Sequence, residues 1–207
     1  MRERWDTGRT EAFSDGVFAI AITLLVLDIR IPPTEFDHLW SAILHEWPAY
    51  LGFATSFITI GGIWLAHHGT FRRLRYANQA VMRVNLLLLM AVSFLPFPTR
   101  LVAEAIRSQS AERAAVVFYG LVLLAISALF SALWGAVAAD PGLLQPDVSE
   151  QQVRAILVAS SPNLAFYAGV TLVAVAAPRV AAFGYLAIAV VAVLRARGDE
   201  RQPEPAT

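Results

Sequence analysis

Six long apolar runs, separated by short polar or proline-containing breaks, constrain this chain more than any other feature of its sequence. A helix needs about 20 apolar residues to cross the hydrocarbon core of a bilayer. The runs are too continuous for strands of a membrane barrel, which alternate in polarity and span about ten residues. Charged residues make up only 15% of the chain, as a lipid-facing surface requires, because hydrocarbon does not solvate charge. The sequence therefore predicts an all-α, polytopic membrane protein with six transmembrane helices.

The breaks between the runs set the expected helix boundaries. Proline cannot continue a helix, and it occurs in the breaks Ile31-Pro32-Pro33, Pro96-Phe97-Pro98 and Asp140-Pro141-Gly142. The predicted helices are residues 10–28, 39–67, 77–95, 114–139, 153–177 and 180–194. They form one transmembrane domain, residues 1–195, followed by a polar cytoplasmic tail, residues 196–207.

Arginine placement predicts the orientation of the bundle. Six crossings put both termini on one side of the membrane, and basic residues are enriched in cytoplasmic loops. With the N-terminus inside, five of the sixteen basic residues lie outside, which leaves eleven inside. The five are Arg30, Arg100, Arg107, Arg113 and Arg179. We therefore expect both termini to be cytoplasmic.

The first apolar run contains the ionisable segment Phe13-Ser14-Asp15. A carboxylate inside a membrane helix costs a few kcal/mol at the bilayer centre and by default marks a functional site. Asp15 lies near the start of its helix, where the helix dipole lowers this cost. Two interpretations stay open: an ion site, or an anchor that satisfies free N–H groups at the helix start.

A second polar group, Trp64-x-x-His67-His68, ends the second run, and Asn85 lies in the third. In the predicted topology these side chains share the depth of Ser14 and Asp15. Polar groups at one depth in lipid are expected to bond one another. Adjacent histidines point to different faces of a helix, so a hydrogen-bonded clamp is favoured over a metal site. We expect no metal and no cofactor.

The first run also carries an apolar stripe, Ile20, Leu24 and Leu27, with Thr23 beside it. Ala12, Gly16 and Ala19 form a ridge of small residues that lets another helix approach closely. Periodicity alone does not distinguish a pore lining from a lipid-facing surface. The carbonyl filter segment Thr-Val-Gly-Tyr-Gly is absent, and so are the phosphate-loop and common hydrolase motifs. A net charge of zero gives no basic field for nucleic acid. We expect neither an enzyme nor a nucleic-acid-binding protein.

The segment Arg9-x-x-x-Phe13-Ser14-Asp15 resembles the first-helix signature of the transmembrane protein 175 family. These proteins are endosomal and lysosomal potassium channels in animals, with shorter six-helix relatives in bacteria. The segments Trp64-x-x-His67-His68 and Pro96-Phe97-Pro98-Thr99 also resemble the bacterial members.

This resemblance implies a homotetramer in the cell membrane, in which four copies of the first helix line a potassium-permeable pore around a symmetry axis. The narrowest ring would be Ile20, with further apolar rings at Leu24 and Leu27, and Thr23 would influence selectivity. A structural network would hold the pore helix in place. Its members would be Arg9, Phe13, Ser14 and Asp15, with Trp64, His67, His68 and Asn85 as partners.

Three alternative functions remain open, and two of them would use the same polar residues. A proton channel or proton-coupled transporter would use the layer of Asp15, His67 and His68, which can carry protons. A membrane enzyme or metal-binding protein would use this layer as well. A structural bundle would transport nothing.

Overall fold

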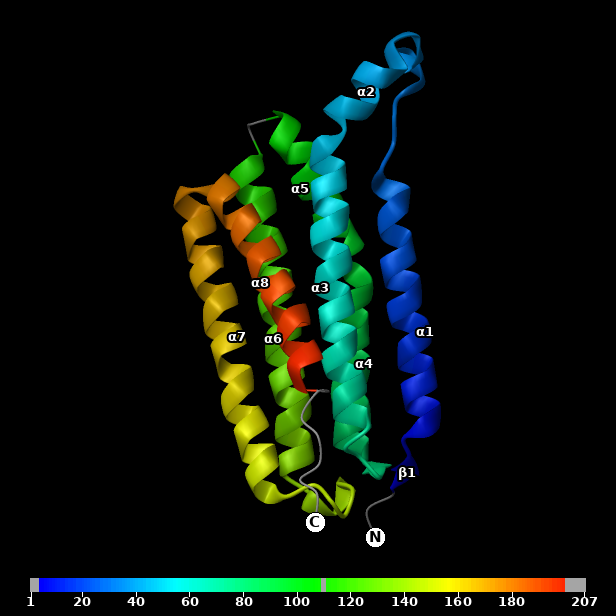
Figure 1. Ribbon diagram of the computed structural model, residues 1–207, viewed down its shortest axis with the longest axis vertical. Coiled ribbons are helices and arrows are strands. Elements are labelled where there is room, and N and C mark those ends of the chain that lie inside the picture. Colours follow the sequence, from blue (N-terminus) through cyan, green and yellow to red (C-terminus); the bar gives the residue numbers. More distant parts are fainter. Residues whose placement is uncertain (1–3, 109–110, 200–207) are drawn as a thin grey trace.

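Long helices lie side by side in one bundle, which the computed structural model describes for residues 4–108 and 111–199 (Figure 1). The all-α prediction is confirmed. The helices are α1 (Gly8–Leu24), α2 (Leu39–His45), α3 (Trp47–Phe71), α4 (Gln79–Phe94), α5 (Pro96–Ser108), α6 (Glu112–Ala138), α7 (Glu150–Ala176) and α8 (Pro178–Asp199). Short 3-10 helices span Leu25–Asp28, Pro33–His38 and Pro141–Leu143, and two short strands are β1 (Trp5–Asp6) and β2 (Tyr76–Ala77).

The chain passes along the bundle six times, with α4 and α5 sharing one pass (Figure 1). Four segments are long and apolar enough to cross a membrane: Gly8–Asp28, Trp47–Phe71, Gln79–Ile106 and Glu112–Ala138. The last two passes contain shorter apolar stretches, Leu164–Ala176 and Pro178–Leu194. The six passes agree with the six transmembrane helices predicted from the sequence.

Proline positions explain where the observed boundaries differ from the expected ones. The second predicted helix, residues 39–67, is divided at Glu46, and its longer part runs on to Phe71. Pro48 then lies in the first turn of α3, where proline is tolerated. The third predicted helix, residues 77–95, continues past Leu95 because Pro96 opens α5. The Leu95 carbonyl accepts the Thr99 N–H (3.2 Å) and the Thr99 hydroxyl (2.8 Å), which holds the two helices together across the break.

The two ends of the chain also differ from the expected boundaries. The first helix tightens into a 3-10 turn at residues 25–28. The last helix reaches Asp199, so residues 196–199 of the predicted tail are helical. Residues 200–207 lie outside the described part of the chain.

Helix α6 is central in the bundle and packs against α4, α5, α7 and α8, whereas α3 packs against α1, α5 and α8, and α1 lies at one edge (Figure 1). Fully buried side chains fill the space between these helices, among them Ile60, Leu88, Leu133, Trp134 and Val137. Helix α1 packs mainly against α3 and α4. One side of α1 is therefore turned toward the bundle, and the other side is left uncovered by the described part of the chain.

Buried hydroxyl groups join three of the passes, and the sequence did not point to them. Thr99 donates to the Leu95 carbonyl, so it must accept from Ser56, 2.7 Å away. Ser56 in turn accepts from Tyr119 at 3.0 Å. Because each hydroxyl has one hydrogen, the direction of the chain is fixed as Tyr119 to Ser56 to Thr99. These bonds connect α6, α3 and α5 through the apolar interior.

The connections at the end where α1 begins are joined to one another. Strand β1 pairs antiparallel with β2, and Leu74 pairs with Leu144. The Arg4 guanidinium lies 3.3 Å from the Asp140 carboxylate. The segment before α1 is thus attached to both the α3–α4 and the α6–α7 connections.

The packing around Gly120 on α6 predicts that two glycine-to-alanine substitutions on this helix will differ in their effect on stability. A Cβ atom at Gly120 would collide with the Tyr185 hydroxyl and the Thr171 hydroxyl, which are hydrogen-bonded to each other at 3.1 Å. Gly120→Ala is therefore expected to lower the free energy of unfolding by about 2 kcal/mol, a typical cost of overpacking. Gly135 lies on the same helix, and a methyl group added there would meet nothing within 4 Å. Unfolding in mixed detergent should show Gly135→Ala as neutral or stabilising, because alanine favours helix; equal losses in both variants would contradict the prediction.

Candidate functional site

The buried side of α1 carries the polar residues singled out by the sequence. Thr10, Ser14, Phe18, Ala21 and Leu25 are its buried positions. Their spacing of three or four residues places them on one face of the helix. This face meets α3 and α4, so a hydroxyl at Ser14 and a carboxylate at Asp15 are brought to the helix–helix junction.

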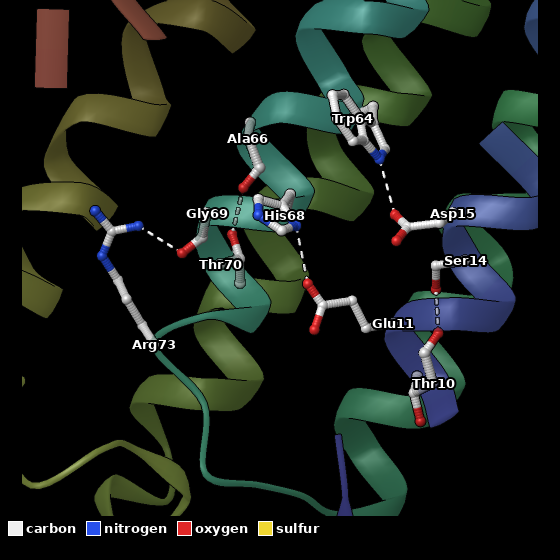
Figure 2. A network of polar contacts seen from close by, with 10 residues as sticks. All are labelled: Thr10, Glu11, Ser14, Asp15, Trp64, Ala66, His68, Gly69, Thr70 and Arg73. Carbon is white, nitrogen blue, oxygen red and sulfur yellow. Dashed lines mark hydrogen bonds and ion pairs between the residues drawn. The ribbon is translucent and has the colours of Figure 1, made fainter. Parts of the chain in front are cut away.

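Asp15 is bonded to α3 through a tryptophan (Figure 2). The Trp64 indole N–H donates to Asp15 Oδ1 at 2.8 Å. The Trp64 ring stacks on His68, with centroids 5.8 Å apart. His68 Nδ1 lies 2.9 Å from Glu11 Oε1, one turn before Asp15 on α1. Two carboxylates of α1 are thus held by consecutive turns of α3.

A second chain of bonds runs from α3 through α4 to α1. The Ser14 hydroxyl donates to the Thr10 carbonyl at 2.8 Å, so its oxygen must accept from the Asn85 amide N–H at 3.1 Å. The Asn85 carbonyl oxygen then faces His67 Nε2 at 2.8 Å. This orientation requires the hydrogen of the neutral imidazole to be on Nε2. Ser14, His67 and Asn85 are each at most 1% exposed.

We call Ser14, Asp15, Trp64, His67 and Asn85 the clamp. Buried polar groups are costly to leave without partners, so the clamp favours one position of α1 against α3 and α4. The His67 ring adds aromatic contact, lying 4.4 Å from Phe71 and 5.3 Å from Phe18 between centroids. The clamp is therefore suited to positioning a helix. Within the described residues, no three His, Cys, Asp or Glu side chains gather as a metal site requires.

The opposite side of α1 is exposed along its whole length. Ile20, Leu24 and Leu27 are 61%, 42% and 57% exposed, and Phe13 is 57% exposed. Arg9, Ala12, Gly16, Ala19 and Thr23 are exposed on the same side. We call this surface the open face of α1.

Thr23 is the one hydroxyl on the open face within the described part of α1. Its hydrogen is directed back into the helix, toward the carbonyls of Ala19 (3.0 Å) and Ile20 (2.9 Å). The oxygen lone pairs are then left as acceptors on the exposed side. Thr23 can therefore accept from water or contact a cation without breaking a bond within the protein.

The structure sorts the expected network residues into two groups. Ser14, Asp15, Trp64, His67, His68 and Asn85 come together at the junction of α1, α3 and α4. Arg9 and Phe13 lie on the open face. Glu11 was not among the residues predicted from the sequence, although its position one turn before Asp15 on the same helix could have indicated it.

Comparison with known proteins places this arrangement in a family. Residues 9–96 match the model of a family described as endosomal/lysosomal potassium channel TMEM175. A protein of Streptomyces collinus named as a potassium channel is 40% identical over 186 residues, covering 88% of this chain and 90% of that protein. The chain belongs to the TMEM175 family. The matched region contains α1, α3 and α4, and so includes both the clamp and the open face.

A solved TMEM175 structure has the same fold. The crystal structure described as a lysosomal potassium-selective channel TMEM175 homolog from Chamaesiphon minutus superposes with a TM-score of 0.83 at 37% identity. It covers 92% of this chain and 97% of its own. The human endosomal/lysosomal proton channel TMEM175 is 33% identical over 158 residues, and the match spans 31% of its length. The resemblance inferred from the signature residues is confirmed.

Proposed function

We propose that this chain is one subunit of a homotetrameric, potassium-permeable cation channel in the cell membrane, with cytoplasmic termini. Four copies of α1 would line the pore through their open faces. The observation that carries the proposal is the division of α1 into two sides. The clamp fixes one side to α3 and α4, and the other side presents a continuous surface that this chain does not cover.

The composition of the open face supports a pore rather than a purely lipid-facing surface. Helices α7 and α8 also expose large apolar residues, such as Leu172 and Val180. The exposed side of α7 also alternates small and large residues, as Gly16 and Ala19 do with their large neighbours on α1. The open face of α1 differs in exposing a hydroxyl, that of Thr23, whereas Thr171 of α7 is buried. Small residues let helices approach closely in membranes. Neighbouring copies of α1 could therefore pack around an axis while Ile20, Leu24 and Leu27 point into the lumen.

A ring of Ile20 side chains would form a hydrophobic constriction. Such a constriction gates by losing its water. Leu24 and Leu27 would add apolar rings one and two turns further along. These side chains are not suited to chemical catalysis, so we assign no catalytic residue and no cofactor, and potassium is the permeant ion.

Single-cysteine variants test the pore directly because the chain contains no cysteine. The wild type, reconstituted in vesicles with a potassium gradient, should pass potassium. Ile20→Cys should conduct until a thiol-reactive cation is added, which should block it, because the new thiol faces the lumen. Leu121→Cys, on an exposed position of α6, is the control and should be insensitive. Absence of flux from the wild type, or equal block of both variants, would contradict the proposal.

Thr23 is expected to contribute to selectivity through its free lone pairs. Thr23→Val keeps the shape of the side chain and removes the oxygen that faces the open side. Loss of one such contact, worth about 0.7 kcal/mol, should reduce the potassium-to-sodium permeability ratio roughly threefold. Bi-ionic reversal potentials measure this ratio. The matched control Thr70→Val, on a buried threonine of α3 that bonds to its own helix, should leave it unchanged.

Proton conduction is a second candidate, supported by the name of the human relative and by the titratable groups near the clamp. A pH gradient without permeant metal cations separates the two functions. If protons pass through the layer of Asp15, His67 and His68, Asp15→Asn should stop proton flux. Potassium flux that continues without any proton flux would favour the potassium channel alone.

A further inference from the structure

A groove lies between β1 and the start of α4. Its volume is about 240 Å³, and its walls are Trp5, Gln79, Met82, Arg83 and Leu86. Trp5 is 40% exposed and Leu86 is 54% exposed. The groove thus combines an aromatic ring, a cation and apolar surface, and it is separate from both the clamp and the open face of α1.

The apolar wall of the groove continues along α4 toward the membrane interior. Leu86, Met90 and Phe94 are 54%, 64% and 45% exposed and are spaced four residues apart. A helix rises 1.5 Å per residue, so Met90 lies about 10 Å along the axis from Arg83. An extended apolar chain bound beside Arg83 would therefore find matching surface for at least this distance.

The Arg83 guanidinium has no hydrogen-bond or ion-pair partner among the described residues, and the same holds for the guanidinium groups of Arg9 and Arg72. All three are exposed at the end of the bundle where α1 begins. An exposed guanidinium beside apolar surface offers a planar set of donors suited to phosphate. The groove therefore has positive charge at its polar end that no side chain in the described part of the chain neutralises.

Four carboxylates of the segment before α1, of α1 itself and of the α6–α7 connection are already engaged within the chain. Asp6 accepts the Gly8 N–H, and Asp140 pairs with Arg4. Glu11 lies against His68, and Asp15 accepts from Trp64. A second copy of the chain that used one of these four carboxylates as a partner for Arg83 would need to break the contact that this carboxylate already makes. A lipid phosphate needs no such exchange.

We propose that this groove binds an anionic phospholipid, with the phosphate at Arg83, the headgroup region beside Trp5 and an acyl chain along Leu86 and Met90. Trp is enriched at the membrane–water interface, and arginines there attract anionic headgroups. The site does not depend on the channel function, since it lies on α4 and β1.

Quenching of tryptophan fluorescence by brominated lipids tests the proposal in the intact protein. The Trp5 contribution is obtained as the difference between the wild type and Trp5→Phe. In phosphatidylcholine vesicles, brominated phosphatidylglycerol should quench this contribution more strongly than brominated phosphatidylcholine. Arg83→Gln should lower the preference for phosphatidylglycerol about fivefold, as expected for one arginine at a charged interface.

Two controls define the outcome. Arg83→Lys keeps the charge and should retain the preference. Arg100→Gln removes an arginine engaged with Glu104 on α5 and should leave the preference unchanged. Equal quenching by both lipids in the wild type, an unchanged preference in Arg83→Gln, or complete shielding of Trp5 from both lipids would overturn the proposal. Shielding would indicate that another copy of the chain covers the groove.

Discussion

Replacing Ile20 by asparagine is expected to raise potassium flux through the reconstituted protein about tenfold, a change of about 1.4 kcal/mol in the barrier. Ile20 is the most exposed of the three aliphatic residues on the open face of α1, at 61%. In the proposed tetramer, four isoleucines form a ring that water leaves readily, and an ion crossing it loses hydration. Asparagine has a similar size and offers polar atoms that keep the lumen wet. Flux is measured by the decay of a potassium gradient in vesicles.

The control for this variant must be equally exposed but outside the proposed pore. Leu121, at 51% exposed on α6, meets this condition. Leu121→Asn should leave flux at the wild-type level, or lower it if insertion suffers. Ile20→Asn flux that does not exceed that of the wild type, with protein amounts matched, would remove Ile20 from the role of constriction.

The clamp was largely predictable because each of its members is a polar group in an apolar helix. Ser14, Asp15, Trp64, His67 and Asn85 were expected at one depth, where lipid offers no alternative partner. The pattern of bonds was not predictable. It depends on the single hydrogen of Ser14, which is directed to the Thr10 carbonyl and so fixes the orientation of Asn85.

Where the sequence-based predictions differ from the structure, they relied on local features of the sequence, such as a proline or the neighbours of a residue along the chain. Pro96 predicts the end of a helix, but a proline that opens the next helix interrupts only one turn. The family resemblance implies that Arg9 and Phe13 belong to the network that holds the pore helix, and this chain alone places both on the open face. Residues 9 and 13 are one turn apart and share a face, and Phe13 is 57% exposed on the side away from Ser14. Tertiary position, not adjacency in the sequence, decides which partners are reached.

The two sides of α1 are physically connected, and this determines what clamp mutations should do. The clamp holds α1 through Ser14 and Asp15 in the first half of the helix, and the open-face residue Ile20 follows Asp15 by five positions. A rigid helix transmits a rotation at Ser14 to Ile20. Loss of the clamp is therefore expected to affect both the stability of the bundle and the position of the proposed constriction.

Replacing Asn85 by leucine is expected to lower the free energy of unfolding by about 3 to 4 kcal/mol, since it leaves the buried His67 Nε2–H without an acceptor and the buried Ser14 oxygen without a donor. The variant removes the acceptor of the His67 Nε2–H and the donor to the Ser14 oxygen, which are 2.8 Å and 3.1 Å from Asn85. Leucine fits the volume, so the loss reports on bonding rather than on a cavity. Unfolding is followed by far-UV circular dichroism in mixed detergent.

The control and a double mutant separate this bonding effect from other changes on α4. Ser93→Ala, on the same helix, removes a hydroxyl that bonds only to the Leu89 carbonyl and should change stability by less than about 0.5 kcal/mol. Ser14→Ala combined with Asn85→Leu should destabilise less than the sum of the two single changes, because both remove the same bond. Strict additivity would mean that Ser14 and Asn85 are not coupled, and the clamp would then not act as one unit.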